Sequence, residues 1–191
     1  MYKKCATEAS AARQRQLEQG LLTAMSKRRY EEITVSELCE DLGIPRKSFY
    51  RYFSGKEGAL HALIDHTLQE FEMEYIPAMI AERTSFQQGL EMYFRFWQEK
   101  KDFLDALQRS GLSGVLLERS ITNAAITTME ESKHLLPERR SLKMETIMFA
   151  LCGMTSMVVR WHHEGYAMDA RSMSILASRL LTRPLFSEYA E

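Results

Sequence analysis

The sequence predicts an all-α protein of about nine helices. Three observations support this fold class. Apolar residues recur every third or fourth position along most of the 191 residues, and Ser, Thr or Asp stands where several of the helical stretches would begin. Proline occurs only four times. With 45% hydrophobic residues, the chain can bury a core as one domain or as a small domain joined to a larger one.

The positive charge is concentrated near the N-terminus. Residues 1–56 hold 11 lysines and arginines against seven acidic residues, although the whole chain has a net charge of -1. Such an excess suggests contact with a polyanion, and a solvated surface is the alternative. The local pattern of side chains has to decide between them.

The first two helices follow from periodicity and capping signals. Apolar residues at helical spacing predict a helix over 11–27. Thr34 and Glu37 fit the S/T-x-x-E capping box, in which each side chain satisfies a free amide at a helix start. A second helix is therefore expected from Thr34, and Gly43 suits the left-handed residue that ends it.

A third and a fourth helix follow directly. Pro45 suits a first helical position, and Phe49 and Phe53, four residues apart, predict one buried ridge. Ser54 and Glu57 fit a second capping box, which would open a long fourth helix reaching Pro77. Two short helices separated by a glycine turn are typical of a helix-turn-helix.

The third helix would present a polar surface if its phenylalanines face inward. Its remaining side chains are rich in hydrogen-bond donors, and one helix is thin enough to enter a major groove. The alternative is a basic, solvated helix. The side chains predicted to point outward are Arg46, Lys47, Ser48, Tyr50, Arg51 and Tyr52.

The stretch ITVSELCEDLGIPRKSFYRYFSGKEGAL resembles the DNA-binding domain of the tetracycline-repressor (TetR) family of bacterial regulators. The similarity covers about residues 9–70, so it implies a DNA-binding domain over 1–70 and a helical effector-binding and dimerisation domain over 71–191. It places the helix-turn-helix at 34–53, with the recognition helix beginning near Pro45. Many members have a small hydroxyl residue where this chain has Pro45, so a cap is absent there.

The resemblance also implies roles for individual residues. Five positions are similar to those that contact mainly phosphates: Thr34, Ser36, Tyr50, Tyr52 and Lys56. Four are similar to those that approach base edges: Arg46, Lys47, Ser48 and Arg51.

Beyond residue 71 the chain is rich in methionine and holds both tryptophans. Helices are expected near 86–100, 101–108, 114–133, 138–164 and 170–181. Gly165 suits a C-terminal cap and Asp169 an N-cap. Family members generally bind an effector in this part and form dimers through their last two long helices.

An effector pocket would be lined by large apolar or soft side chains, although plain core is the alternative for each. The candidates are Met92, Tyr93, Phe96, Trp97, Phe103, Met129, Phe149, Cys152 and Trp161. The run 147–159 is apolar on nearly every side, as expected of a helix buried both by its own domain and by a partner subunit. Met173, Leu176 and Leu180 form a stripe that would meet the same partner or a monomer's core.

Several functions and sites are not indicated. His162, His163 and Glu164 are adjacent on a helix and point in different directions, so no metal site is expected. No phosphate loop, nucleophile elbow or supported carboxylate pair indicates an enzyme, and no cofactor is implied. The three cysteines are not closely paired, the N-terminus is not a signal peptide, and the run 147–159 falls short of a membrane span. We therefore expect a cytoplasmic protein.

Two functions remain open. The first is a homodimeric transcriptional regulator, with repression as the expected mode, that binds an inverted repeat in double-stranded DNA and responds to a small apolar effector. The second is a helical interaction module or co-activator controlled by a protein partner. The stretch FRFWQEKKDFLDALQRSGL, with Trp161 four residues before Gly165, resembles a family subgroup that includes a dihydroxyacetone-kinase operon activator, which senses a protein partner.

Overall fold

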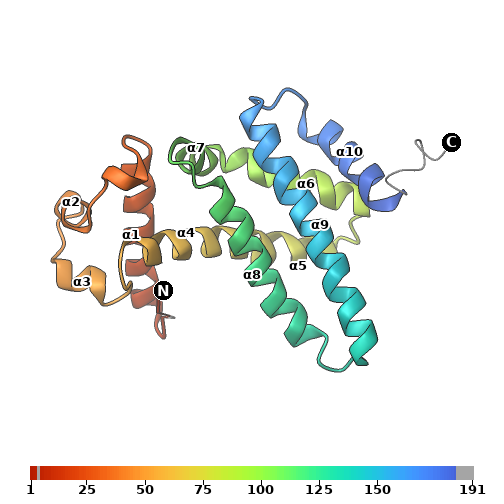
Figure 1. Ribbon diagram of the computed structural model, residues 1–191, viewed down its shortest axis with the longest axis horizontal. Helices are drawn as coiled ribbons and strands as arrows, with labels where there is room; N and C mark the ends of the chain where they lie inside the picture. The colour runs from red at the N-terminus through yellow and green to blue at the C-terminus, as the bar shows by residue number, and fades with distance from the viewer. Residues whose placement is uncertain (4, 184–191) are drawn as a thin grey trace. The chain divides into compact units, whose positions relative to one another are not determined.

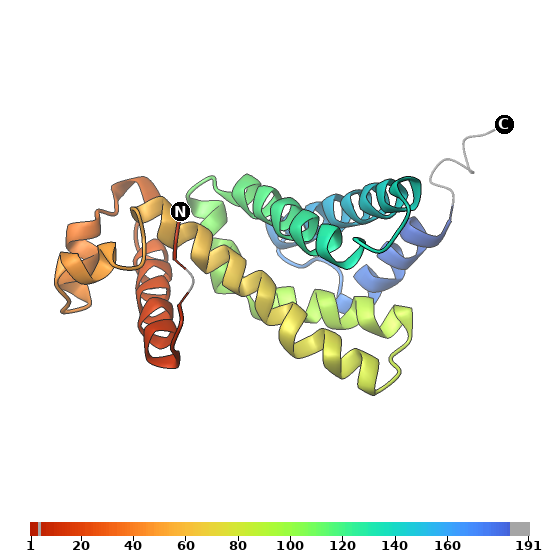
Figure 2. The same cartoon turned by 90° about the horizontal axis from the view of Figure 1, so that it is seen from below.

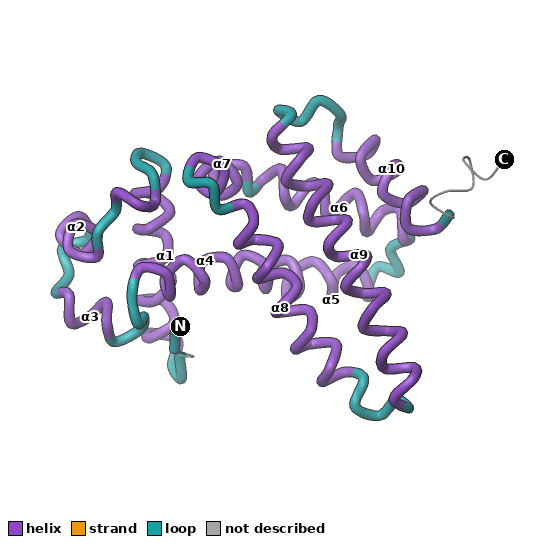
Figure 3. The backbone as a smooth tube through the Cα atoms, viewed as in Figure 1, coloured by secondary structure: helices purple, strands orange, loops and turns teal. Residues whose placement is uncertain are grey.

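The computed structural model describes residues 1–3 and 5–183, and these residues are helical apart from turns and loops (Figure 3). They hold one isolated antiparallel bridge, between Tyr2 and Phe53. The chain forms two compact units. The first unit comprises Met1–Leu68 and Asp102–Arg119, and the second comprises Gln69–Lys101 and the chain from Ser120 onward.

The first unit is built from helices that differ in length, from five residues in α3 to 18 in α1 (Figure 1). Its elements are α1 (Glu8–Met25), the 3₁₀ turn η1 (Tyr30–Glu32), α2 (Val35–Asp41), α3 (Arg46–Tyr50), most of α4 (Lys56–Glu70), α7 (Lys101–Arg109) and the start of α8 (Ser113–Glu131). Helix α2 packs against both α1 and α3. The largest buried side chains of this unit are Leu17, Leu21, Met25, Ile33, Leu38, Phe49, Phe53 and Ile64.

Helix α2 begins and ends as its sequence predicts. The Thr34 hydroxyl accepts a hydrogen bond from the Glu37 amide at 3.2 Å, and the Glu37 carboxylate accepts from the Thr34 amide at 2.9 Å. Gly43 follows with φ of +62°, the left-handed conformation that glycine adopts without strain. Both predictions are confirmed.

The starts of α3 and α4 differ from the prediction by one residue or more. Pro45 has ψ of 140°, so it is the N-cap of α3 and lies just outside the helix. Helix α4 begins at Lys56, and the Ala59 amide donates to the Gly55 carbonyl at 3.3 Å, which makes Gly55 its N-cap. A capping box at Ser54 requires the helix to begin one residue earlier. The prediction of that box is wrong.

The second unit contains the longer helices. Its elements are the π-helical segment η2 (Phe71–Tyr75), α5 (Ile76–Ala81), α6 (Phe86–Glu99), the rest of α8, α9 (Pro137–His163) and α10 (Ala170–Thr182). Each of the nine predicted helices forms within the described residues, and α5 is additional. Pro77 does not end the helical path as expected, because α5 continues directly after η2. Proline has no amide hydrogen, and the wider π turn before it removes the need for a regular bond to the preceding turn.

Aromatic side chains form much of the core of the second unit. The ring centroids of Phe94 and Trp161 are 5.5 Å apart, and those of Phe71 and Phe96 are 5.3 Å apart. The Trp161 indole also donates to the Met168 carbonyl at 2.8 Å. The first ring contact joins α6 to α9, and the second joins η2 to α6.

Helix α10 packs against α6, and its Met173 and Ala177 are buried there. For Met173 the core alternative therefore holds. Asp169 accepts from the Ser172 amide at 2.7 Å, and Gly165 has φ of +67°, so both predicted caps are confirmed.

Helices α8 and α9 lie side by side and run in opposite directions (Figures 1 and 2). The Arg140 guanidinium closes the end of α8 by donating to the carbonyls of Ser132, Lys133 and Leu135, at 3.2, 2.9 and 3.2 Å. Within the described residues, α9 is long and apolar enough to cross a membrane by length and composition, and 17% of its apolar window is buried. Helix α9 is longer than the apolar run 147–159 that was considered in the sequence, because it begins ten residues before that run, at Pro137. Most residues of this apolar window are therefore not buried within the chain.

Candidate nucleic-acid interface

Two phenylalanines fix the recognition helix α3. Phe49 is 0% exposed and Phe53 is 1% exposed, and their ring centroids are 5.1 Å apart. A five-residue helix makes few internal hydrogen bonds and is not stable in isolation. The packing of these rings therefore determines which face of α3 points outward.

The outward face of α3 is cationic. Arg46, Lys47 and Arg51 are exposed, and no ion pair among the described residues neutralises them. Tyr50 is 46% exposed, and the Arg46 guanidinium carbon lies 6.0 Å from the centroid of its ring. Ser48, which lies between Arg46 and Tyr50 in the sequence, is partly exposed. The predicted base-reading residues are thus all at least partly exposed.

Two cations that precede α2, Arg28 and Arg29, are already paired. The Arg28 guanidinium lies 3.0 Å from the Glu37 carboxylate, and Arg29 lies 3.5 Å from Glu31. Within the described residues 27–51, the exposed cations without an ion pair are Arg46, Lys47 and Arg51 on or directly after α3, and Lys27 before α2. An unpaired guanidinium or ammonium on a narrow helix is suited to bind phosphate oxygens and base acceptors.

Thr34 and Ser36 both lie in the first turn of α2 and are accessible. The Thr34 hydroxyl also donates to the Glu37 carboxylate at 2.7 Å. This hydrogen bond is the main cause that lowers the pKa of Glu37, and a backbone bond from Thr34 and the Arg28 guanidinium add to it. The Thr34 side chain is therefore held in one position at the edge of the surface.

Tyr52 and Lys56 are placed differently from the other candidates. Tyr52 is only 8% exposed. The Lys56 ammonium donates to the carbonyls of Tyr30 and Ile33 at 2.5 and 2.6 Å, and it lies 4.2 Å from the centroid of the Tyr30 ring. Burial lowers the pKa of Lys56. The ammonium thus stabilises η1. Tyr52 and Lys56 therefore do not belong to the exposed set that contains Arg46, Lys47 and Arg51.

The candidates for an effector pocket differ in their burial. Phe96, Trp97 and Trp161 are buried in the aromatic core of the second unit, whereas Phe103 belongs to the first unit. Met129 and Phe149 are 58% and 64% exposed, and Cys152 is partly exposed. Tyr93 is enclosed near Trp97 and Thr155, and burial raises its pKa to about 12.

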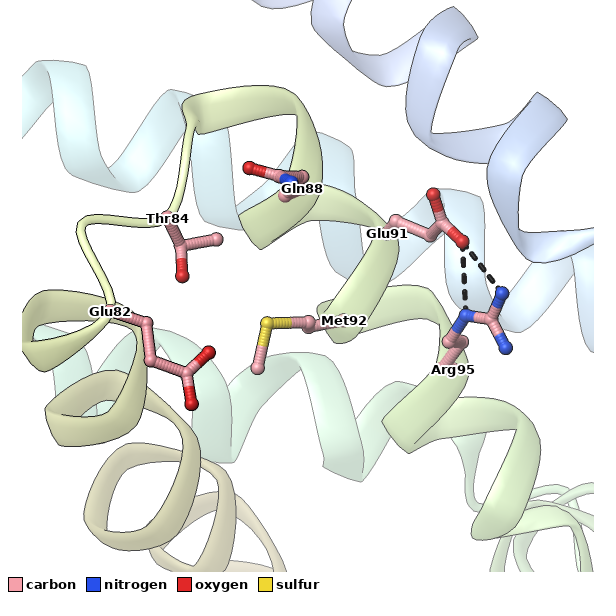
Figure 4. Close-up of a pocket in the computed structure, with 6 residues that line it drawn as sticks. All are labelled: Glu82, Thr84, Gln88, Glu91, Met92 and Arg95. Atoms are coloured by element: carbon pink, nitrogen blue, oxygen red, sulfur yellow. Dashed lines mark hydrogen bonds and ion pairs between the residues drawn. The ribbon is translucent and has the colours of Figure 1, made fainter.

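A cavity of about 400 Å³ lies between the end of α5 and α6, and Met92 is the one predicted pocket residue that lines it (Figure 4). Its other lining residues are Glu82, Thr84, Gln88, Glu91 and Arg95. The Arg95 guanidinium donates twice to one Glu91 oxygen, at 3.0 and 2.7 Å. Most of these lining residues are polar, so the apolar pattern that predicts a pocket does not mark this site. The S-x-x-Q capping box formed by Ser85 and Gln88 was a usable signal for the start of α6.

The described residues contain no group of three or more His, Cys, Asp and Glu side chains that could hold a metal ion. A short helix, a turn with a left-handed glycine and a second helix with an unneutralised cationic face define a DNA-binding helix-turn-helix. Residues 22–63, which include this unit, match the family described as bacterial regulatory proteins, tetR family. The family match therefore covers the part of the chain that contains the helix-turn-helix.

Comparisons with individual proteins agree with this family. The chain is 25% identical over 127 residues to the HTH-type transcriptional regulator EthR of Mycolicibacterium smegmatis, which covers 60% of this chain and 58% of that protein. The match thus spans less than two thirds of that relative. Among solved structures, the fatty acid degradation regulator FadR from Bacillus halodurans has a TM-score of 0.58 at 15% identity, covering 96% of this chain and 98% of the other.

Two further solved structures share the fold. The dihydroxyacetone kinase operon activator DhaS has a TM-score of 0.57 at 16% identity and covers 88% of this chain and 93% of its own. A tetR-family transcriptional regulator from Streptomyces coelicolor has a TM-score of 0.53 at 18% identity, covering 90% of this chain and 79% of the other. At these identities the likeness concerns the fold alone.

Proposed function

We propose that the protein is a cytoplasmic transcriptional regulator that binds an inverted repeat in duplex DNA as a homodimer and represses until an effector binds its second unit. The observation that carries the proposal is the outward face of α3, where three cations without ion pairs stand above two fully buried phenylalanines. Because the buried rings hold the helix in place, its exposed side chains can present hydrogen-bond donors to the major groove. No catalytic role is proposed.

Contacts in the proposed complex divide by chemistry. Arg46, Lys47, Ser48 and Arg51 lie where side chains of a recognition helix reach base edges, and they would read sequence. Thr34, Ser36 and Tyr50 lie at the margin and would position the protein on phosphates. Lys56 and Tyr52 would act from within the fold, because one is committed to backbone carbonyls and the other is buried.

Exposed apolar side chains on α8 and α9 support the proposed dimer. They are Ile126 and Met129 on α8, Leu142 and Phe149 on α9, and Leu136 directly before α9, each 58% to 69% exposed. Apolar side chains gathered in this way mark surfaces that bind protein or membrane. We assign the face to a second copy of the chain, because two-fold symmetric homodimers are the commonest oligomers and a symmetric inverted repeat requires one.

The test of the proposed function is selection from a library of random DNA duplexes. A dimer with one recognition helix per half-site should enrich inverted repeats whose half-sites lie roughly 34 Å apart. Affinity for the selected duplex should fall steeply as salt rises, since phosphate contacts release counterions. Absence of any enriched sequence, or affinity that does not depend on salt, would overturn the proposal.

A second candidate function is control by a protein partner in place of a small molecule. It is favoured by Met73, Ile76 and Ile80, which are apolar and 75%, 40% and 73% exposed. Their spacing places them along one side of the helical path, and the exposed Glu72 and Glu74 lie beside them. A basic amphipathic helix is the kind of partner that such a stripe fits.

The two candidate functions predict that different substitutions abolish the response of DNA affinity to an effector. If a small molecule acts at the cavity between α5 and α6, Met92→Trp should fill the cavity and abolish the change in DNA affinity that the molecule causes. If a protein acts, Ile80→Asp should abolish the response and Met92→Trp should leave it intact. Affinity for the selected duplex, measured with and without each effector, distinguishes them.

A further inference from the structure

The first three residues lie against the end of the recognition helix. Tyr2 forms the bridge to Phe53, and the Lys3 amide donates to the Tyr52 carbonyl at 3.0 Å. The Ser54 amide donates to the Met1 carbonyl at 3.1 Å. We call Met1–Lys3 the strap. It is bonded through the backbone to the segment that connects α3 with α4.

The Tyr2 side chain anchors the strap in the interior of the first unit. Its hydroxyl donates to the Asp65 carboxylate at 2.7 Å, and its ring meets His66 edge-on with centroids 5.7 Å apart. Asp65, on α4, is 1% exposed. Arg119, on α8, donates to the same carboxylate through Nε at 2.8 Å and also through Nη2. A buried carboxylate held by an arginine fork is a rigid acceptor for the tyrosine.

Gly58 provides the space that the strap occupies. A Cβ atom at this position of α4 would lie 2.5 Å from the Met1 carbonyl oxygen, a distance at which the backbone must move. Gly58 has no positive φ. Close approach of the strap therefore accounts for glycine inside a helix, where it is less favourable than alanine.

We propose that Tyr2 is a positioning residue for DNA recognition: through the strap it sets the orientation of α3, and the Asp65–Arg119 pair holds its anchor. The inference rests on the proposed function. Base reading needs each donor within hydrogen-bond distance of one acceptor, whereas phosphate attraction tolerates displacement. Loss of the strap should therefore lower affinity for the selected duplex more than affinity for random DNA.

The seating of the strap can be tested without DNA. The experiment uses the full chain with any purification tag at its C-terminus and follows exchange of the Lys3 amide by NMR. In the wild type this amide should be protected. Gly58→Ala should expose it, while Gly114→Ala, whose added Cβ atom meets nothing within 4 Å, should leave it protected. A Lys3 amide that exchanges freely in the wild type would overturn the inference whatever DNA the protein binds.

The role in recognition is tested by the ratio of affinities for the selected and random duplexes. Tyr2→Phe keeps the ring and the backbone bonds but removes one hydrogen bond to a carboxylate, so we expect the ratio to fall roughly five- to tenfold. Gly58→Ala should lower it similarly, although alanine favours the helix, and Gly114→Ala should not change it. General destabilisation would lower both affinities together and leave the ratio constant, which would contradict the proposal.

Arg119→Lys tests the anchor, because lysine keeps the charge but cannot form the fork. As a single substitution it should lower the ratio of affinities for the selected and random duplexes. Combined with Tyr2→Phe, it should have little further effect. An equal effect in both backgrounds would show that Arg119 acts by another route. If the wild type selects no sequence at all, the proposed function fails, whereas a selected sequence with an unchanged ratio in Tyr2→Phe and Gly58→Ala refutes the strap alone.

Discussion

At the scale of single residues, neighbouring cations in the sequence have different environments. Arg46 is exposed on α3, whereas Lys56, ten positions later, is directed at the carbonyls of Tyr30 and Ile33. A charge-assisted hydrogen bond contributes more than a neutral one, and carbonyls that lose their donor carry a desolvation cost. Lys56 is therefore a stabilising residue of the first unit, and Arg46 is free for a ligand.

We predict opposite effects for these two cations. Lys56→Met should lower the free energy of unfolding by about 1–3 kcal/mol, because η1 loses its donor. Arg46→Ala should change stability by less than about 0.5 kcal/mol but relax preference at one base pair by roughly 1–3 kcal/mol. Urea titrations and binding to duplexes with single substitutions measure both. If Lys56→Met keeps wild-type stability and weakens binding to all sequences alike, Lys56 contacts phosphate after all.

At the scale of elements, short helices depend on their ends. Helix α2 has seven residues and carries a complete capping box, with Thr34 at its start and Gly43 after its end. The longer helices α9 and α10 have capping residues of the same kind, Gly165 after α9 and Asp169 before α10. Each device joins residues three or four positions apart, so each acts before the helices pack together.

Removal of the Thr34 hydroxyl should be visible in the titration of Glu37. The pKa of Glu37 is lowered chiefly by that hydroxyl, so its contribution to stability is present above the pKa of the unfolded chain and is lost as pH falls through the lower folded value. Thr34→Val should raise the pKa of Glu37 towards its ordinary value, as followed by NMR. The pKa of Asp169, which is lowered by Ser172, should not change and serves as the internal control. An unchanged pKa of Glu37 would refute this assignment.

At the scale of the whole molecule, α8 and α9 leave large apolar side chains exposed among the described residues. Leu142, Phe149, Gly153 and Ser156 are exposed at intervals of seven, four and three residues, so they follow one side of α9. A Cβ atom at Gly153 would meet nothing within 4 Å in the chain itself. Glycine at that position allows another backbone to approach closely.

We predict that Gly153→Leu breaks the proposed dimer. Leucine is favoured over glycine inside a helix, so helical content by circular dichroism should not fall. A two-fold interface carries the new side chain twice, and overpacking should raise the dimer dissociation constant at least tenfold, about 1.4 kcal/mol. Sedimentation equilibrium measures it, and Gly114→Leu, also in open space, is the control. A wild-type dissociation constant in Gly153→Leu would move the interface away from α9.

Local signals in the sequence determined much of the fold and the recognition face. Thr34, Gly43 and Asp169 could be assigned because their hydrogen bonds or backbone angles involve neighbours within four residues. Phe49 and Phe53 could be assigned inward because their spacing matches one helical turn. Arg46, Lys47 and Arg51, which lie before and between these phenylalanines, were then placed outward by the same periodicity.

Only the tertiary structure decided which side chains are committed to distant partners. Tyr2 and Asp65 are 63 positions apart, Asp65 and Arg119 are 54 apart, and the carbonyls that bind Lys56 precede it by 23 and 26 positions. No periodicity links such residues, because their contact depends on how whole helices pack. For the same reason Trp97 and Phe149 read alike in the sequence as large apolar residues, yet one is buried in the core and the other is exposed on α9.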